Sequence, residues 1–253
     1  MRRAIILALT TACALTAALL WMTPVRAAFF ASPLDHRAAY AVTIAGIEIG
    51  DAALLVRTDE AGYAVEVTGG FRFLFWSGAA EAESLGAREA AGFAPNRYRS
   101  RFESPMRIFT TAIDFGGGAP EGRWRAEPPL EGDGFEDRVP ITEADLKGAK
   151  DPLSAFLIPA ETGREACAQS LKVFSGVVRF DVDLRLIEEA PDGVVDCLGA
   201  YRPVAGHRRV SGEVSRLERD GLRVALFELA PGLWAPERLG FSTRFGTLAI
   251  ERR

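Results

Sequence analysis

Three arginines spaced two residues apart form the most chemically specific pattern in the sequence. A strand over this segment would present Arg97, Arg99 and Arg101 on one face. Arginine binds carboxylates and phosphates through paired N–H donors, which makes the row, with Arg107 nearby, a candidate site for a lipid phosphate or another acidic group. Glutamates at positions 81 and 83 offer a competing structural role, because an adjacent strand would place them beside the arginines.

This competing role predicts one hairpin. If residues 86–92 connect two strands, the turn is centred near residue 90, and Glu83 lies opposite Arg97. The same register places Glu81 opposite Arg99, and each such pair adds roughly 0.2–1 kcal/mol. Arg101 is then left without an acidic partner and is the arginine most available to a ligand. The other face joins small side chains to large ones, namely Ala80 and Ala82 to Tyr98 and Phe102.

An aromatic cluster is the second candidate binding element. Phe71, Phe73, Phe75 and Trp76 follow a pair of glycines. Such a cluster can pack the core, but in a sheet that curls without closing the same side chains can line an apolar groove. These four aromatics and Arg101 are therefore the candidate ligand-binding residues, and they suit an amphipathic ligand.

Residues typical of catalysis are sparse. The sequence has no H-E-x-x-H, G-x-S-x-G, P-loop or G-x-G-x-x-G motif. As a general base His207 would need a nucleophile and an orienting carboxylate within reach, and the sequence shows neither. His207 is therefore expected to be a turn histidine, and His36 is likewise given no catalytic role. A hydrolase assembled from distant loops stays open as an alternative, and it requires His207 to be buried beside a serine and a carboxylate. We predict no catalytic residue, no metal site and no cofactor.

A disulfide is expected between the two cysteines outside the N-terminal apolar run, Cys167 and Cys197. An exported protein meets an oxidising compartment, and the pair is not a C-x-x-C motif. A metal pair and a redox dithiol are the alternatives. Closing a loop of about 30 residues stabilises a fold by roughly 3–4 kcal/mol in the chain-entropy model.

Alternation of apolar and polar residues predicts an antiparallel all-β fold with little helix. The clearest strand is 177–187, where Arg179, Asp181, Asp183 and Arg185 fall on a face expected to be solvated and ion-paired. Strands this short and frequent predict a curled sheet, as an incomplete barrel or β-spiral. The other predicted strands are 39–44, 47–57, 63–68, 76–85, 97–103, 108–115, 122–126, 196–202, 213–217, 222–229, 234–239 and 247–251.

One short helix is predicted at 151–159. Asp151 can cap its N-terminus, and Pro152 suits the first helical position. Residues 71–75 fit either a helical turn or a strand. The chain shows no fixed-period repeat, so residues 28–253 are expected to form one β-rich domain with an irregular middle near 116–134.

The N-terminus has the pattern of a secretory signal peptide. Arg2 and Arg3 precede an uncharged apolar run to residue 22, and Val25-Arg26-Ala27 offers a cleavage site after residue 27. Cleavage would leave 27 basic and 34 acidic residues, a balance that disfavours non-specific nucleic-acid binding. No second long apolar segment follows, so we expect an exported periplasmic protein that is not integral to the membrane.

Four segments are similar to one protein family. Residues 167–186 contain a cysteine, Val-Phe-Ser-Gly and an alternating strand, and residues 197–206 read Cys-Leu-Gly-Ala-Tyr-Arg-Pro-Val-Ala-Gly. Residues 233–250 contain Leu-Trp-Ala-Pro-Glu-Arg and Thr-x-x-Gly, and residues 44–50 read Ile-Ala-Gly-Ile-Glu-Ile-Gly. Across most of 28–253 the chain resembles the domain of unknown function 3108 family of exported proteobacterial proteins. Ser175 stands where the family pattern would have Asp.

The resemblance implies a curled antiparallel sheet similar to the incomplete barrels of lipoprotein carriers and envelope-integrity proteins. It also implies a Gram-negative periplasm, and it transfers no catalytic residue. We therefore expect a non-enzymatic protein that binds an apolar or amphipathic envelope component, such as a lipid or lipoprotein. A protein-interaction or scaffolding module for envelope maintenance, with an envelope protein as its partner, is the alternative.

Overall fold

Strands make up most of the computed structural model, which describes residues 33–89, 92–116, 124–129 and 137–253. The predicted signal peptide at 1–27 lies outside these residues. The first strands are β1 Leu34–Ile44, β2 Ile47–Thr58, β3 Tyr63–Phe73, β4 Trp76–Glu89, β5 Gly92–Ser104, β6 Arg107–Asp114 and β7 Trp124–Glu127. The remaining strands are β8 Ile158–Pro159, β9 Ser170–Phe174, β10 Arg179–Glu189, β11 Val195–Ala205, β12 Leu222–Ala230, β13 Leu233–Thr243 and β14 Gly246–Arg252. The helices are α2 Glu143–Leu146, α3 Pro152–Ala155, α4 Gly163–Ala166 and α5 Gly212–Asp220.

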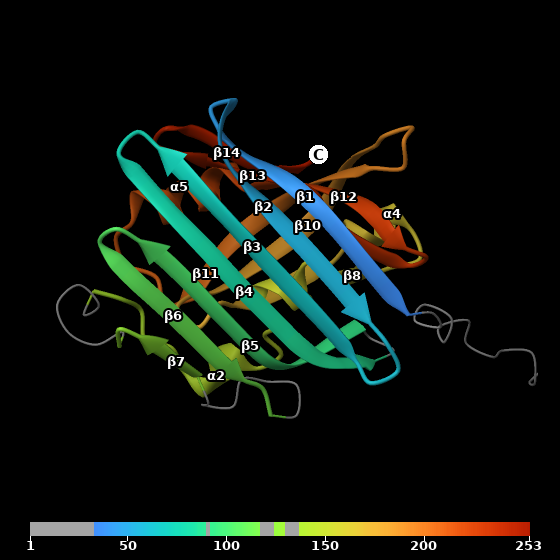
Figure 1. The fold of residues 1–253 in the computed structure, drawn as a ribbon, viewed down its shortest axis with the longest axis horizontal. Helices are drawn as coiled ribbons and strands as arrows, with labels where there is room; N and C mark the ends of the chain where they lie inside the picture. The colour runs from blue at the N-terminus through green and yellow to red at the C-terminus, as the bar shows by residue number, and fades with distance from the viewer. Residues whose placement is uncertain (1–32, 90–91, 117–123, 130–136) are drawn as a thin grey trace, which may run out of the picture. The chain divides into compact units, whose positions relative to one another are not determined.

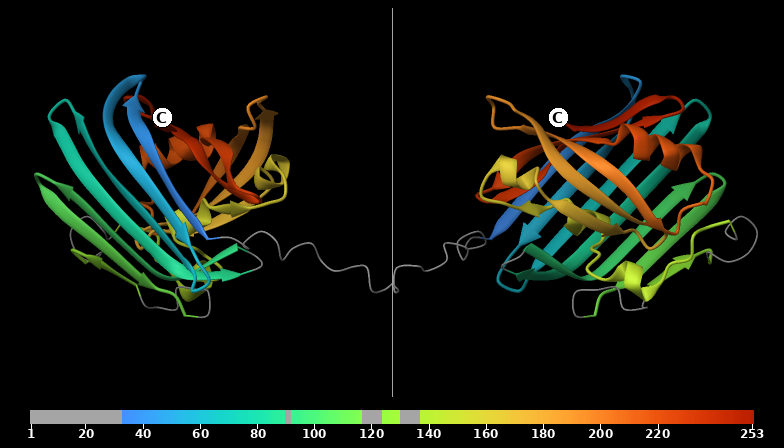
Figure 2. Two further views of the ribbon diagram at one scale, coloured as in Figure 1. Left: turned by 45° about the vertical axis from the view of Figure 1, so that its right-hand side comes forward. Right: turned by 180° about the vertical axis from the view of Figure 1, so that it is seen from behind.

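All strands belong to one antiparallel sheet. Its order is β7-β6-β5-β4-β3-β2-β1-β14-β13-β12-β11-β10-β9, with β8 paired to β13. Most neighbours in the sheet are also neighbours in the chain, but β1 and β14 join the two ends of the described chain in mid-sheet. Within the described residues the end strands β7 and β9 do not pair with each other, so the sheet curls without closing (Figure 1; Figure 2). The predicted fold class, an all-β curled antiparallel sheet with minor helix, is confirmed.

Short helical segments fill part of the curl. In Figure 2 the yellow segments lie between the two arms of the sheet. The helix α3 contacts β3, β4 and β5 from one arm and β9 from the other. A cluster around Tyr98, Ile113 and Phe174 packs these parts together, and Leu146 of α2 belongs to it. The helical segments therefore bridge the opening that the unclosed sheet leaves.

A second apolar cluster surrounds the cysteine pair. Cys167 and Cys197 lie at disulfide distance, with their Cα atoms 5.6 Å apart, and both are buried. The pair connects the C-terminal end of α4 to β11. Buried neighbours include Val195, Val224 and Trp234. The predicted pairing of the two cysteines is confirmed.

The helix expected at 151–159 is shorter than predicted. Asp151 caps it, accepting hydrogen bonds from the N–H groups of Leu153 and Ser154, and Pro152 occupies the first turn as expected. The helix ends at residue 155 because Ile158–Pro159 form the short strand β8 against β13. The segment 71–75 continues β3 to Phe73 and then turns.

The strand predicted at 213–217 is wrong, because this segment lies in the helix α5. The Ser211 hydroxyl accepts a hydrogen bond from the Val214 N–H, and Gly221 ends the helix with φ of +69°. Val214 and Leu217 are three residues apart and pack together against the apolar cluster around the disulfide. The helices α2 and α4 and the strand β9 are elements that the sequence reading did not identify.

The solvated charged face predicted for 177–187 is wrong at one end. Arg179 and Asp181 are both buried, and their side chains form an ion pair of 2.5 Å. The Arg179 Nε also donates to the backbone carbonyl of Asp145, so the preceding chain covers this end of β10. Asp183 and Arg185, further along the strand, are exposed as predicted.

Candidate functional site

The candidate site lies at one end of the sheet, where three hairpin tips meet. The turns of β1–β2, β3–β4 and β13–β14 lie side by side because the sheet order places these strands next to one another (Figure 1). Gly246 permits the close approach of two tips: it has φ of +112°, and a Cβ there would lie 2.8 Å from the Cβ of Ala45. The first and last strands of the described chain, β1 and β14, which pair with each other, thus form one side of the site.

An apolar cleft of about 360 Å³ opens between these tips. Phe71 and Phe73 of β3 and Trp76 of β4 line it, so the structure brings together three of the four predicted aromatics. Its other lining residues are Val42, Ile44, Ile49, Glu213, Thr243, Arg244, Phe245 and Leu248. We call this the aromatic cleft. Its volume falls within the range of small-molecule sites.

Ring contacts hold the aromatic cleft in shape. The Phe245 ring lies 5.7 Å from that of Phe73 and 5.6 Å from that of Trp76, both in edge-on geometry. Phe71 and Phe102 stack at 6.4 Å, and they lie over Gly78, where a Cβ would come within 3 Å of both rings. Gly78 therefore gives the two rings their place on the sheet.

Phe75 has a different position from the other predicted aromatics. It is 84% exposed and is not among the residues that line the cleft. Its ring contacts that of Trp76 edge-on at 5.9 Å. The aromatic cluster therefore extends from the cleft, where three of its residues lie, to the exposed hairpin tip, where Phe75 lies.

Arg244 supplies the cation of the aromatic cleft. Its guanidinium lies 4.6 Å from the centre of the Phe245 ring and 5.6 Å from that of Trp76. Within the described residues it forms no ion pair with a carboxylate. The one carboxylate lining the cleft, that of Glu213, pairs with Arg216 at 3.1 Å. An acidic group at the mouth of the cleft could therefore accept hydrogen bonds from Arg244.

The predicted register of the arginine hairpin is wrong by two residues. The strands β4 and β5 do pair, but Glu83 lies opposite Arg99 and Glu81 opposite Arg101. On the other face Ala80 lies opposite Phe102, while Tyr98 lies opposite Ser84. A bulge between Leu85 and Gly86, together with strands that extend to residues 89 and 92, shifts the pairing.

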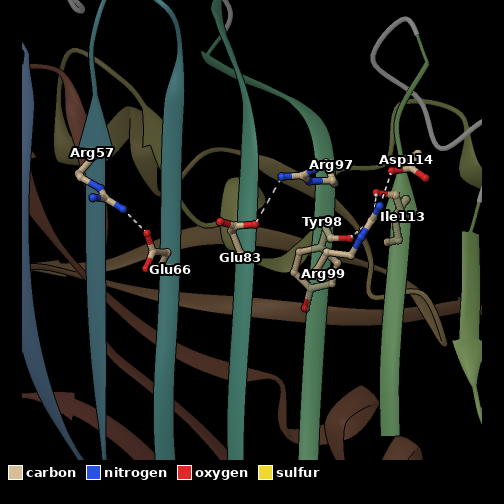
Figure 3. Close-up of polar contacts among 8 residues, drawn as sticks. All are labelled: Arg57, Glu66, Glu83, Arg97, Tyr98, Arg99, Ile113 and Asp114. Carbon is tan, nitrogen blue, oxygen red and sulfur yellow. Dashed lines mark hydrogen bonds and ion pairs between the residues drawn. The ribbon is translucent and has the colours of Figure 1, made fainter.

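Arg101 is correspondingly not free. It pairs with Glu103 at 2.8 Å and with Glu81 at 4.0 Å, and it lies outside the aromatic cleft. Arg97 reaches Glu83 at 3.9 Å between neighbouring strands of the sheet (Figure 3). A groove of about 420 Å³ on these strands is lined by both arginines and glutamates, so the cations there already have anionic neighbours.

Arg99 is the most firmly held arginine of the row. Its guanidinium donates to the backbone carbonyls of Tyr98 and Ile113 and to the Asp114 carboxylate at 2.8 Å (Figure 3). The hydrogen bond from Arg99 lowers the pKa of Asp114. Each arginine of the row therefore has a carboxylate neighbour, and the cross-strand pairing that was the alternative to anion binding is present for Arg97 and Arg101 with Glu83 and Glu81.

His207 was the other candidate for chemistry. It is buried, and its Nε2 lies 3.0 Å from the hydroxyl of Tyr201. No hydrogen bond joins its ring to a serine or a carboxylate within the described residues. In the same part of the chain, no group of three or more His, Cys, Asp and Glu side chains is placed to hold a metal ion.

Sequence reasoning missed Arg244 and Phe245 at the tip of the β13–β14 hairpin. The local signal was present, since Thr243 and Gly246 bracket a tight turn with a large aromatic side chain in it. The Thr243 hydroxyl donates to the Gly246 carbonyl and accepts from the Phe245 N–H. The pairing of β1 with β14, which brings this tip to Trp76, could not be predicted from the local sequence.

Comparison with known proteins gives no relative. No family model, no curated protein and no solved structure matches the chain. The family resemblance therefore stays a prediction. Among the described residues no helix is both long and apolar enough to cross a membrane.

Proposed function

We propose that this protein is an exported, non-enzymatic binding protein of the cell envelope, and that its aromatic cleft holds the acyl chain of an anionic lipid or lipoprotein. One observation carries the proposal: an arginine without a carboxylate partner in the described residues lies at an apolar cleft lined by Phe71, Phe73, Trp76 and Phe245. Such a site offers an apolar surface to a chain and a guanidinium to its head group.

The energetics favour an amphiphile over a purely polar ligand. Each methylene that leaves water for an apolar cleft contributes about 0.8 kcal/mol. A charge-assisted hydrogen bond from Arg244 to a carboxylate or phosphate adds about 1.5–3 kcal/mol. A small polar anion gains only the second contribution. The export assignment rests on the N-terminal sequence, with its basic start, apolar run and small residues at the cleavage site.

Native mass spectrometry of the protein purified from the cells that make it tests the proposal first. A co-purifying lipid that organic extraction releases is the expected result. Delipidated protein is then titrated with cis-parinaric acid, whose fluorescence rises in an apolar site, and with its uncharged methyl ester. We expect saturable binding of the acid. A protein that carries no lipid and binds neither probe would refute the proposal.

Two variants assign the binding to the aromatic cleft. Arg244→Gln should weaken binding of the acid about tenfold or more while leaving the ester unchanged, because only the acid meets the guanidinium. Phe71→Ala should weaken both probes, because it removes cleft wall. Arg185→Gln, at an exposed arginine of β10 outside the cleft, is the matched control and should bind like the parent protein.

A scaffolding role is the second candidate, favoured by the sheet ends. Within the described residues β7 pairs only with β6, which leaves its other edge to add a strand from a partner. The β9 edge is less available, because Lys150 forms a parallel bridge to Val173 and backbone hydrogen bonds with Lys172 and Phe174. Cross-linking in cells from a photoreactive residue in β7 tests this role, and the absence of a specific adduct would count against it.

A further inference from the structure

Large apolar side chains are exposed mainly at one rim of the sheet. Of the ten exposed in the described residues, eight lie within three residues of four hairpin turns, at 45–46, 74–75, 105–106 and 244–245. These eight are Ile47, Leu74, Phe75, Trp76, Phe102, Met106, Ile108 and Phe245, and we call them the apolar rim. The four turns follow one another along the upper left of Figure 1.

The most protruding members of the apolar rim are almost fully exposed. Met106 is 94% exposed and Phe75 is 84% exposed, each at the tip of its hairpin. Single exposed apolar residues are common on proteins, but an alignment of them at four adjacent tips marks an interaction surface. These side chains lie on or beside hairpin turns, and Trp76 and Phe245 are in contact across two of the tips. An apolar edge made of hairpin turns suits a deformable apolar partner.

The opposite rim differs in composition. Its described turns include 59–62 and 191–193. Among the exposed large apolar side chains of the described residues, only that of Ile187 lies near this rim. Both rims consist of hairpin turns of one antiparallel sheet. The difference in exposed apolar residues therefore comes from the amino-acid sequences of the turns. The exposed apolar residues are therefore not a general consequence of the unclosed sheet.

Basic side chains flank the apolar rim. Arg72, Arg107 and Arg244 are exposed at the same hairpins, and none of the three forms an ion pair within the described residues. Three carboxylates near these turns are already paired: Glu48 with Arg253, Glu103 with Arg101, and Glu213 with Arg216. Asp51, which lines a surface hollow with Arg72, is exposed and forms no ion pair within the described residues. The rim thus has an excess of unpaired positive charge around its apolar tips, because among the described residues three unpaired arginines face one unpaired carboxylate.

We propose that the apolar rim is a membrane-docking surface that inserts its hairpin tips into the interface of an anionic lipid bilayer. Trp, Phe and Met enter the boundary between head groups and acyl chains, and arginines beside them attract anionic head groups. The unpaired arginines, which attract anionic head groups, and the apolar hairpin turns together favour an anionic bilayer over a second protein surface. The proposal does not require the aromatic cleft to hold a ligand.

Flotation with vesicles tests the docking surface, using phosphatidylcholine alone and phosphatidylcholine mixed with phosphatidylglycerol. We expect binding to the mixed vesicles that weakens as salt rises. Phe75→Ser and Met106→Ser should each weaken it about tenfold. Replacing Arg72, Arg107 and Arg244 by Gln should weaken binding to the mixed vesicles about fivefold for each arginine replaced. Binding to the phosphatidylcholine vesicles should change little.

The chain offers a matched control for these variants. Ile108 in the rim is 47% exposed and Ile187, near the opposite rim, is 49% exposed, so Ile108→Ser should weaken binding while Ile187→Ser should not. All variants share one N-terminal segment, so any binding by that segment is common to them. Fluorescence quenching by brominated lipid, measured with and without Trp76→Phe, reports whether the β3–β4 tip itself enters the bilayer.

The outcomes separate this proposal from the proposed function. Loss of vesicle binding in the Ile108 variant, with normal cis-parinaric acid binding, supports the docking surface. A parent protein whose Trp76 is not quenched on vesicles it binds, or equal binding by the Ile108 and Ile187 variants, overturns it. A parent protein that ignores vesicles but dimerises through the rim in sedimentation also overturns it and assigns the rim to a second copy of the chain.

Discussion

The hydroxyl of Ser84 donates a 2.8 Å hydrogen bond to the carboxylate of Asp151, which lies 67 residues further along the chain. Both residues are fully buried, and the same carboxylate caps α3 through the N–H groups of Leu153 and Ser154. Tyr63 of β3 adds its hydroxyl at 3.1 Å from that of Ser84. This network fixes the helix that bridges the curl to the inner face of the sheet.

Ser84→Ala should therefore lower the free energy of unfolding by about 1–3 kcal/mol, because it removes a hydrogen-bond donor from the buried Asp151 carboxyl group. Urea unfolding followed by circular dichroism measures the change. Ser170→Ala is the matched control, since the Ser170 hydroxyl also donates to a carboxylate, that of Asp183, but at an exposed site. The control should change stability by less than about 0.5 kcal/mol. Equal effects of the two variants would contradict the role given to Asp151.

A second prediction concerns the buried ion pair of Arg179 and Asp181. Asp181→Ala leaves the Arg179 guanidinium buried without its carboxylate. The substitution should therefore lower the free energy of unfolding by about 3–5 kcal/mol. Asp183→Ala, two residues along the same strand and exposed, should cost far less. Denaturation midpoints of the two variants give the comparison. An Asp181 variant as stable as the Asp183 variant would contradict the structure of this end of β10.

A third prediction concerns acid sensitivity. Burial and then the charge of Arg138 lower the pKa of His207 below its ordinary value of 6.5. Below pH 6.5 the unfolded chain therefore binds a proton that the folded protein still resists. The stability contributed by neutral His207 is present in full above pH 6.5 and is lost as the pH falls toward the lower pKa of the folded state.

Melting temperatures between pH 7.5 and pH 5 measure this effect. His207→Gln should be less stable at neutral pH, because it disturbs the contact with the Tyr201 hydroxyl, but its stability should fall less steeply on acidification. The informative quantity is the slope of melting temperature against pH. A packing defect alone would lower the melting temperature at every pH and leave this slope unchanged. Parallel pH profiles for the parent and the variant would rule out His207 as the titrating group.

The β4–β5 hairpin shows what charge patterns can and cannot predict. The alternation of Glu81 and Glu83 with the arginines correctly indicated that the two strands pair. It did not fix the register, because a shift by two residues keeps every side chain on its face and still sets glutamate beside arginine. The bulge and the added length near residues 86–92, which decide the register, have no charge signal.

The aromatic cleft shows a different limit. Phe71, Phe73 and Trp76 lie within one local hairpin and could be identified from composition. Arg244 and Phe245 join them only because β1 pairs with β14, a contact between the two ends of the described chain. The charge pattern favours Arg101 as the cation because its predicted register leaves that residue unpaired, whereas the pairing of β1 with β14 brings Arg244 to the cleft.

The fourth prediction concerns the buried pair Cys167 and Cys197, which are 30 residues apart in sequence. Replacing both with serine removes a cross-link that restricts the unfolded chain, and the chain-entropy model gives a loss of about 3–4 kcal/mol for this loop. The added hydroxyls lie in the apolar cluster with Val195 and Val224, so the loss should not be smaller than this. Urea unfolding of the double variant measures it, and parent protein unfolded in the presence of dithiothreitol is the control. The two should unfold at similarly low urea concentrations, whereas a double variant that unfolds at the midpoint of the oxidised parent would contradict a stabilising disulfide between α4 and β11.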